Sequence, residues 1–136
     1  MSAWCAVVAK VEVAEKIRVR RVFAAVDAGE VVNPDGLRNQ IEGGIVQAIS
    51  WTLKEAIRWD RERLLCRTWE DYPILKFDEV PAIEVVLLER PGMPGLGVGE
   101  CAAGPTAAAL ANALWHAMGV RVRDLPLTPE RITAAM

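Results

Sequence analysis

The sequence predicts an α+β domain in which two main helices pack on a mostly antiparallel sheet. Three observations support this class: apolar residues alternate near the N-terminus, a capped helical pattern begins at Asn33-Pro34, and an alanine-rich helical pattern begins at Pro105. The length of 136 residues and the hydrophobic content of 52% suit one domain with a moderate core. We therefore expect residues 1–136 to form a single unit.

The first two strands follow from this alternation. Apolar residues recur at every second position from Val7 to Val13, and a second run extends from Ile17 to Val26. The short polar stretch Ala14-Glu15-Lys16 separates the two runs, and Asp27-Ala28-Gly29 ends the second. This arrangement predicts an antiparallel hairpin.

A long helix should follow, because Asn33 can cap it and Pro34 suits the first helical position. One face is apolar and should lie in the core: Leu37, Ile41, Ile45, Ala48, Ile49, Thr52 and Ala56. The other side carries Gln40, Gly43, Gly44 and Gln47, although each helical glycine costs about 1 kcal/mol relative to alanine. Something should therefore approach this side closely. Both another segment of the chain and a ligand bonded by Gln40 fit that expectation.

The middle of the chain is expected to be mostly sheet. Residues 55–59 and 64–69 flank a polar turn and predict a second hairpin, and alternating apolar residues predict a further strand over 83–87.

Two more helices are expected towards the C-terminus. The alanine-rich helix over 106–118 is apolar almost all round and ends at Gly119, so it should be buried on most sides. A short strand over 120–122 and a terminal helix capped at Thr128-Pro129 should complete the chain.

Composition excludes several classes of function. The net charge of −2, with scattered basic residues, gives no footprint for nucleic acid, and no apolar run is long enough to cross a membrane. The three cysteines are far apart in sequence, and the single histidine, His116, has no second histidine beside it, so no protein-built metal site is expected. No secretory signal is recognisable, and we expect a cytoplasmic protein.

The strongest candidate for a functional segment is a glycine-rich loop that ends in a carboxylate. Five of the chain's ten glycines lie between Arg90 and Pro105, and the stretch Gly95-Leu96-Gly97-Val98-Gly99 leads directly to Glu100. Glu100 therefore precedes the alanine-rich helix, whose N-terminal N–H groups favour negative charge. The residues alone leave open whether Glu100 reacts or only caps this helix.

Several motifs together resemble the C-terminal part of the molybdopterin-binding subunit of the xanthine dehydrogenase and aldehyde oxidase family of molybdenum hydroxylases. In chain order the motifs are Val26-Asp27-Ala28-Gly29, Val32-Asn33-Pro34, Gln40-Ile41-Glu42-Gly43-Gly44-Ile45-Val46-Gln47, Asp71-Tyr72-Pro73, Gly97-Val98-Gly99-Glu100 and Ala109-Leu110-Ala111-Asn112-Ala113. Their order and spacing match that family over nearly the whole chain, with subunits resembling isoquinoline 1-oxidoreductase as the best match.

This resemblance implies roles for five residues. Glu100 would be the catalytic base that takes a proton from a molybdenum-bound hydroxyl, Gln40 would hydrogen-bond the molybdenum–pterin cofactor, and Gly99 would lie beside it. The resemblance also favours close cofactor approach at Gly43 and Gly44. Cys101 follows the glutamate where many relatives have proline, and we interpret it as a small residue in a tight turn rather than as a reactive thiol.

The resemblance further implies partners and a reaction class. Family subunits are several times longer, so the upstream half of the subunit would have to supply the other cofactor contacts and most of the substrate pocket. An iron–sulfur subunit would carry the iron–sulfur clusters. The reaction would be hydroxylation of an N-heterocycle or oxidation of an aldehyde, with little activity in the isolated chain.

Two alternatives remain at this point. The chain could be a non-catalytic remnant or assembly module of the same family that binds no metal. Residues 97–102 also fit the pattern Gly-x-Gly-x-x-Ala of nucleotide-binding oxidoreductases, but about nine residues separate the preceding strand from Gly97, where a dinucleotide fold turns almost at once.

Overall fold

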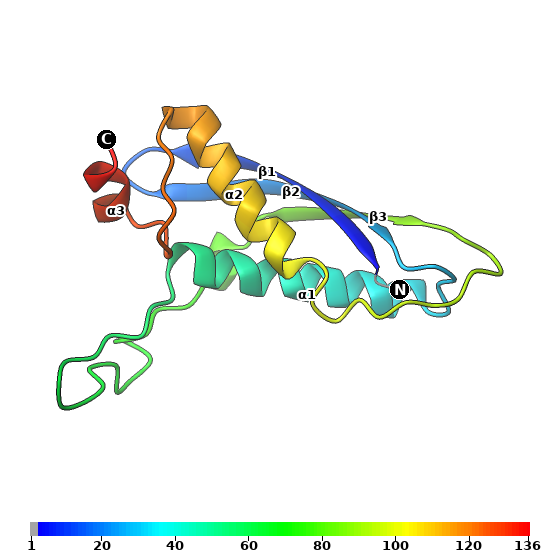
Figure 1. Cartoon of the computed structure of the whole chain (residues 1–136), viewed down its shortest axis with the longest axis horizontal. Coiled ribbons are helices and arrows are strands. Elements are labelled where there is room, and N and C mark those ends of the chain that lie inside the picture. The colour runs from blue at the N-terminus through cyan, green and yellow to red at the C-terminus, as the bar shows by residue number, and fades with distance from the viewer. Residues whose placement is uncertain (1–2) are drawn as a thin grey trace.

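The computed structural model describes residues 3–136 and contains a three-stranded sheet with strand order β1-β2-β3, together with three α-helices (Figure 1). The α+β class is confirmed. The elements, in chain order, are β1 (Trp4–Val13), β2 (Ile17–Asp27), α1 (Pro34–Leu53), a short 3-10 helix (Phe77–Glu79), β3 (Ala82–Leu88), α2 (Ala103–Met118) and α3 (Pro129–Ala134).

The predicted N-terminal hairpin is confirmed. β1 and β2 pair antiparallel from Trp4 opposite Asp27 to Val13 opposite Ile17, with a shift in register between Lys10 and Val11. Strand β3 pairs with the other edge of β2 in the parallel direction, from Arg21 opposite Ala82 to Asp27 opposite Leu88. Because β2, α1 and β3 follow one another in the chain, they form a parallel β-α-β unit. This unit was not predicted from the sequence.

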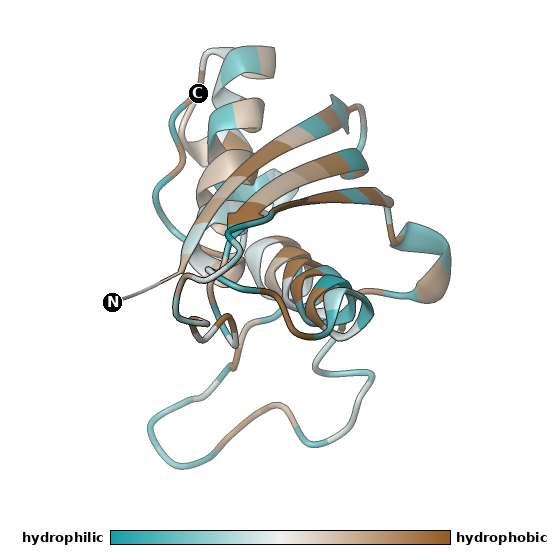
Figure 2. Cartoon of the chain, turned by 90° about the vertical axis from the view of Figure 1, so that its right-hand side faces the viewer, coloured by the Kyte–Doolittle hydropathy of each residue, from teal (hydrophilic) through white to brown (hydrophobic). Residues whose placement is uncertain are grey.

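The main core lies between the sheet and the two long helices. Buried side chains on one face of β2 pack with buried residues of both α1 and α2, so both helices cover the same face of the sheet (Figure 2). The buried residues of this cluster are Val19, Val22, Ala24, Val26, Ala28, Ile41, Ile45, Ile49, Ala102 and Leu110. The opposite face of the sheet is exposed in the burial patterns of all three strands.

Helix α1 begins as its sequence predicts. The Asn33 side chain accepts a hydrogen bond from the Gly36 N–H at 2.9 Å, and Pro34 occupies the first helical turn. The predicted apolar face is buried through Ile41, Ile45 and Ile49. This face therefore fixes which side of α1 turns away from the sheet.

The predicted second hairpin is wrong. Residues 54–76 are mostly irregular and reach away from the sheet, and they contain one isolated antiparallel bridge between Trp59 and Leu64 (Figure 1). Two carboxylates accept hydrogen bonds from backbone N–H groups that would otherwise pair between strands. Asp60 accepts from the N–H groups of Glu62 and Arg63. Asp71 accepts from those of Arg67 and Thr68. Local side-chain bonds of this kind compete with sheet formation.

The C-terminal part agrees only partly with the sequence. Helix α2 ends at Gly119 in the left-handed region, and the Thr128 side chain caps α3 by accepting from the Arg131 N–H. Burial of α2 on most sides is wrong, because Thr106, Leu110 and Leu114 are its buried residues.

The predicted strand at 120–122 is also absent among the described residues. The Arg121 guanidinium instead stacks over the Trp115 ring, 4.7 Å from its centre, and donates a hydrogen bond to Asn112 Oδ1 at 2.7 Å. These two contacts keep residues 120–122 beside α2.

Candidate functional site

The glycine-rich loop between β3 and α2 is anchored on the turn that follows β2. The Leu96 N–H donates to the Ala28 carbonyl oxygen at 2.8 Å, and the Glu30 N–H donates to the Met93 carbonyl oxygen at 3.2 Å. Gly29 lies between these contacts at φ +69°, and a Cβ there would sit 2.0 Å from the Pro94 carbonyl oxygen. Only glycine fits both the backbone angle and the space, so this turn and the loop fit each other.

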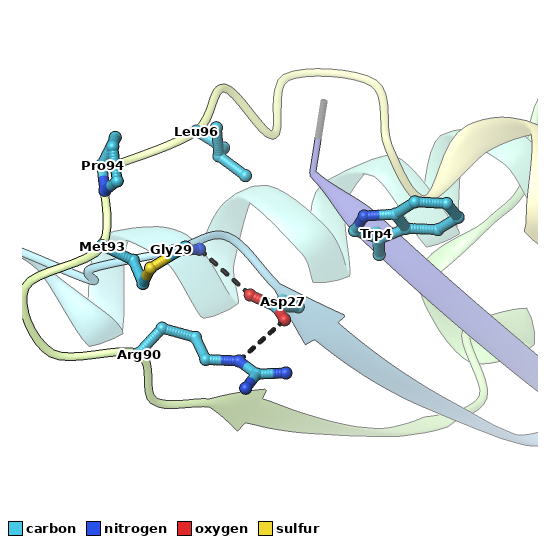
Figure 3. A pocket seen from close by; sticks show the side chains of 7 residues that line it. All are labelled: Trp4, Asp27, Gly29, Arg90, Met93, Pro94 and Leu96. Atoms are coloured by element: carbon cyan, nitrogen blue, oxygen red, sulfur yellow. Dashed lines mark hydrogen bonds and ion pairs between the residues drawn. The ribbon is translucent and has the colours of Figure 1, made fainter. Parts of the chain in front are cut away.

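Asp27, the last residue of β2, joins the same two segments (Figure 3). Its Oδ1 accepts from the Gly29 N–H at 3.2 Å, and its Oδ2 accepts from Arg90 Nε at 3.0 Å. The Gly29 N–H and the Arg90 guanidinium together hold the pKa of Asp27 below its ordinary value. The carboxylate therefore stays charged where β2, the turn and the loop meet.

A cavity of about 690 Å³ opens beside this ion pair. Its lining residues come from β1, β2, the turn and the first part of the loop: Trp4, Asp27, Gly29, Arg90, Met93, Pro94 and Leu96. None of the residues singled out by the sequence for cofactor binding or catalysis lines it. The cavity and the candidate site thus lie along different parts of one loop.

The other end of the loop lies against α1. Gln40 Nε2 donates to the Gly99 carbonyl oxygen at 2.8 Å. A Cβ added to Gly44 would lie 3.8 Å from the Ala102 Cβ. Gln40, Gly43 and Gly44 share one helix face because they are three and four residues apart. The structure therefore brings the predicted residues of α1 and of the loop together.

Glu100 stands directly after this contact. Its carbonyl oxygen accepts from the Ala103 N–H at 3.1 Å, while its exposed side chain makes no hydrogen bond or ion pair within residues 3–136. The N-cap residue of α2 is Ala102, and no side chain caps that helix. The capping role left open for Glu100 thus has no support in the structure.

Gly43 in α1 and Gly99 in the loop expose bare backbone. No atom lies within 4 Å of a Cβ built on Gly43 or on Gly99, and Gly44 makes an ordinary contact with Ala102. Packing of another helix or loop therefore does not account for Gly43 within the described part of the chain. An open strip free of side chains, bordered by the Gln40 amide, suits a flat polar group such as a pterin, so these residues fit that cofactor.

The cysteines behave as partly buried thiols. Burial, together with the neighbouring Cys101, raises the pKa of Cys5 to about 11, and burial also raises the pKa of Cys101. Neither thiol is therefore activated as a thiolate at neutral pH. Within residues 3–136, no group of three or more His, Cys, Asp or Glu side chains could hold a metal ion, and no helix is long and apolar enough to cross a membrane.

The sequence predicted that Asp27-Ala28-Gly29 ends a strand, but not that the Asp27 carboxylate closes the turn or pairs with arginine. An aspartate two residues before a glycine is typical of a turn closed by its own carboxylate, so this part was predictable from the sequence. Its partner Arg90 is 63 residues away, and the parallel pairing of β3 that brings it close was not predicted.

Comparisons with known proteins identify the family of the chain. Residues 1–81 match the model of the molybdopterin cofactor-binding domain. The chain is 45% identical to a nicotinate dehydrogenase subunit of Pseudomonas putida, over 99% of the chain and 12% of that protein. It is 36% identical to the beta subunit of isoquinoline 1-oxidoreductase from Brevundimonas diminuta, over 83% of the chain and 14% of that protein.

Solved structures give the same result. Quinoline 2-oxidoreductase from Pseudomonas putida 86 superposes with a TM-score of 0.78 and 36% identity, over 88% of the chain and 16% of that protein. The aldehyde oxidoreductase from Desulfovibrio desulfuricans superposes with a TM-score of 0.76 and 33% identity, over 90% of the chain and 14% of that protein. The chain thus spans less than a fifth of each of these relatives. It belongs to the molybdopterin cofactor-binding domains of the xanthine dehydrogenase and aldehyde oxidase family.

Proposed function

We propose that residues 1–136 are one unit, the C-terminal portion of the molybdopterin-binding domain of a molybdenum hydroxylase. The hydrogen bond from Gln40 to Gly99 is the observation that carries this proposal. It holds the glutamate-bearing end of the loop across the bare glycine strip of α1, so that a bound cofactor and a free carboxylate would be neighbours.

The cofactor contacts of this chain would come from Gln40, Gly43, Gly44 and Gly99. Gly43 and Gly99 leave their backbone open, and Gln40 offers an amide at the border of the same strip. The molybdenum–pterin cofactor, when bound, supplies the oxygen transfer and accepts the electrons, while the protein provides position and electrostatics.

Glu100 would act as the base. Its carboxylate is free of hydrogen bonds and ion pairs within the described residues, so one of its oxygens can accept the proton that the reaction releases. A general base needs to lie within hydrogen-bonding reach of that proton, about 3 Å. The backbone anchors on both sides of Glu100, at Gly99 and Ala103, restrict where the carboxylate can reach.

The substrate class we propose is an N-heterocycle, with an aldehyde as the alternative. Nicotinate dehydrogenase and isoquinoline 1-oxidoreductase, at 45% and 36% identity, are named for heterocyclic substrates. The molybdenum-binding component of an aldehyde oxidoreductase from Escherichia coli is 32% identical. Because the chain covers 12% to 17% of these proteins, the substrate pocket and the remaining cofactor contacts would come from the rest of the molybdopterin-binding subunit. An iron–sulfur subunit would carry the electrons away.

The first test is the molybdenum content of tagged protein purified gently from its own host, measured by elemental mass spectrometry. The proposal expects about one molybdenum per chain together with larger co-purifying subunits. Folded chain without molybdenum or pterin, in a host whose other hydroxylases are loaded, would contradict it and would indicate a non-catalytic remnant or assembly module of the family.

A further inference from the structure

The face of the sheet that the helices leave uncovered is mostly apolar over one half of its length. Alternate residues of each strand point to this side, and the pairing places them in rows: Val8 beside Phe23, and Ala6 beside Ala25 and Val86. The exposed Glu84 ends the first of these rows on β3 and forms part of the charged rim. Val8 is 66% exposed and Val86 is 53% exposed. We call this set the outer apolar patch: Ala6, Val8, Phe23, Ala25, Val86 and Leu88.

The other half of the same face is charged. Lys10 pairs with Arg21 in the next row, and beyond them Arg20 forms an ion pair with Glu12. Arg21 stacks over Phe23 at 5.3 Å and so marks the border between the halves. One-sided antiparallel sheets normally show polar residues on their free face, which the charged half does and the patch does not.

The patch continues into the cavity beside the Asp27–Arg90 ion pair. Leu88 is in register with Asp27, which is in register with Trp4, and both Trp4 and Asp27 line the cavity. Trp4 is 78% exposed. The charged Asp27, paired with Arg90, separates Leu88 from Trp4 in this row. An exposed apolar surface of this kind, rimmed by charge, marks a protein interaction site.

We propose that the outer apolar patch is the docking surface for the rest of the molybdopterin-binding subunit, on the same or on a separate polypeptide. The matched segment makes up 12% of the nicotinate dehydrogenase relative and 16% of quinoline 2-oxidoreductase, so more than four-fifths of each relative lies outside it. The occupant would present an apolar face to the patch and insert a segment into the cavity. The choice of this partner rests on the proposed function.

The test uses a chimera in which this chain replaces the matched segment of the nicotinate dehydrogenase relative, with which it shares 45% identity. The double variant Val8→Asp with Val86→Asp is made in the chimera and in the isolated chain. Lys10→Asp is the matched control, because Lys10 lies on the same strand and face as Val8 but in the charged half. Thermal unfolding, yield of folded protein and bound molybdenum are measured for each.

The inference expects the double variant to leave the unfolding midpoint of the isolated chain within about 2 °C, because both valines are already more than half exposed. In the chimera it should lower the yield of folded protein at least tenfold, while Lys10→Asp should not. Equal tolerance of both changes in the chimera would overturn the inference. So would an isolated chain that sediments as a dimer which the double variant converts to a monomer, because a second copy would then occupy the patch.

The same experiment separates this inference from the proposed function. A chimera that depends on the patch but holds no molybdenum would contradict the function and leave the docking surface standing. A chimera that holds molybdenum and folds equally well with the patch substitutions would support the proposed function and overturn the docking surface.

Discussion

The side-chain amide of Gln40 donates a hydrogen bond to the main-chain oxygen of Gly99, 59 residues further along the chain, with an N–O distance of 2.8 Å. This one contact fixes the end of the glycine-rich loop to α1. Because Glu100 is the next residue, the position of its carboxylate depends on a helix whose own position is set by Ile41 and Ile45 in the core. Packing of α1 against the sheet thus determines where the proposed base lies.

Gln40→Ala should release this end of the loop and weaken retention of the cofactor. The side chain is exposed, so the substitution removes one hydrogen bond with little loss of packing, and the free energy of unfolding should fall by about 1 kcal/mol or less. Amide hydrogen exchange over residues 97–101 should become faster, and molybdenum per chain in the assembled enzyme should fall. Asn39→Ala, an exposed neighbour on the same helix, is the control; equal effects of both would contradict a specific role for Gln40.

Glu100→Gln should abolish turnover while leaving molybdenum content near that of the unchanged enzyme. The amide has the same shape but cannot accept the proton, and loss of a general base typically lowers the rate by about 10²–10⁴-fold. The rate and the metal content are measured on the assembled enzyme or on the chimera described above. Glu89→Gln changes an exposed glutamate at the start of the same loop and should keep full activity. Loss of metal in parallel with loss of rate would assign Glu100 a structural role instead.

Gly43→Ala should stabilise the isolated chain and impair the assembled enzyme. No atom lies within 4 Å of the added Cβ, and alanine is favoured over glycine in a helix by about 1 kcal/mol. The same methyl group would occupy the strip where the cofactor is proposed to lie, so molybdenum per chain should fall. Unfolding in urea measures the first effect and elemental analysis the second. A stabilised chain with undiminished molybdenum would remove Gly43 from the proposed site.

The local parts of the fold could be predicted from the sequence, and the long-range parts could not. The β1–β2 hairpin and the cap of α1 at Asn33 each depend on residues that are close together in the chain. The parallel pairing of β3 with β2 depends on where the irregular residues 54–76 bring the chain back to the sheet. No periodic pattern in these residues predicts that position.

The site divides in the same way. The glycine loop and Glu100 were visible as a motif, whereas the Gln40–Gly99 contact had to come from the structure. The Asp27–Arg90 ion pair was missed because it follows from the β2–β3 register.

Asp27 should contribute to stability above its ordinary pKa and lose that contribution in acid. The hydrogen bond from the Gly29 N–H is the largest single cause of the lowered pKa of Asp27, and the hydrogen bond and positive charge of Arg90 lower it further. Because the pKa is lowered in the folded state, the stabilisation is complete above the ordinary value of 3.8 and is lost as the pH falls through the folded-state value. The unfolding midpoints of the unchanged chain and of Asp27→Asn should therefore differ at pH 6 and converge in acid.

A carboxyl titration by NMR distinguishes the two causes. In Arg90→Gln the pKa of Asp27 should rise but stay below its ordinary value, since the Gly29 N–H is still present. A complete return to the ordinary value would show that Arg90 alone lowers it.

Thr52 and Thr106 test what a buried hydroxyl costs when it lacks a partner. Both residues are helical and fully buried, but Thr106 Oγ1 donates to the Ala102 carbonyl oxygen at 2.7 Å, whereas Thr52 Oγ1 has no hydrogen-bond partner within the described residues. Valine has nearly the shape of threonine and no hydroxyl. Thr52→Val should therefore stabilise the chain by about 1 kcal/mol, and Thr106→Val should destabilise it by a similar amount. Urea unfolding measures both, and helix propensity cancels because the substitution is the same. Equal changes in the two variants would mean that the Thr52 hydroxyl has found a partner, such as a buried water or the Ala48 carbonyl one turn earlier in α1.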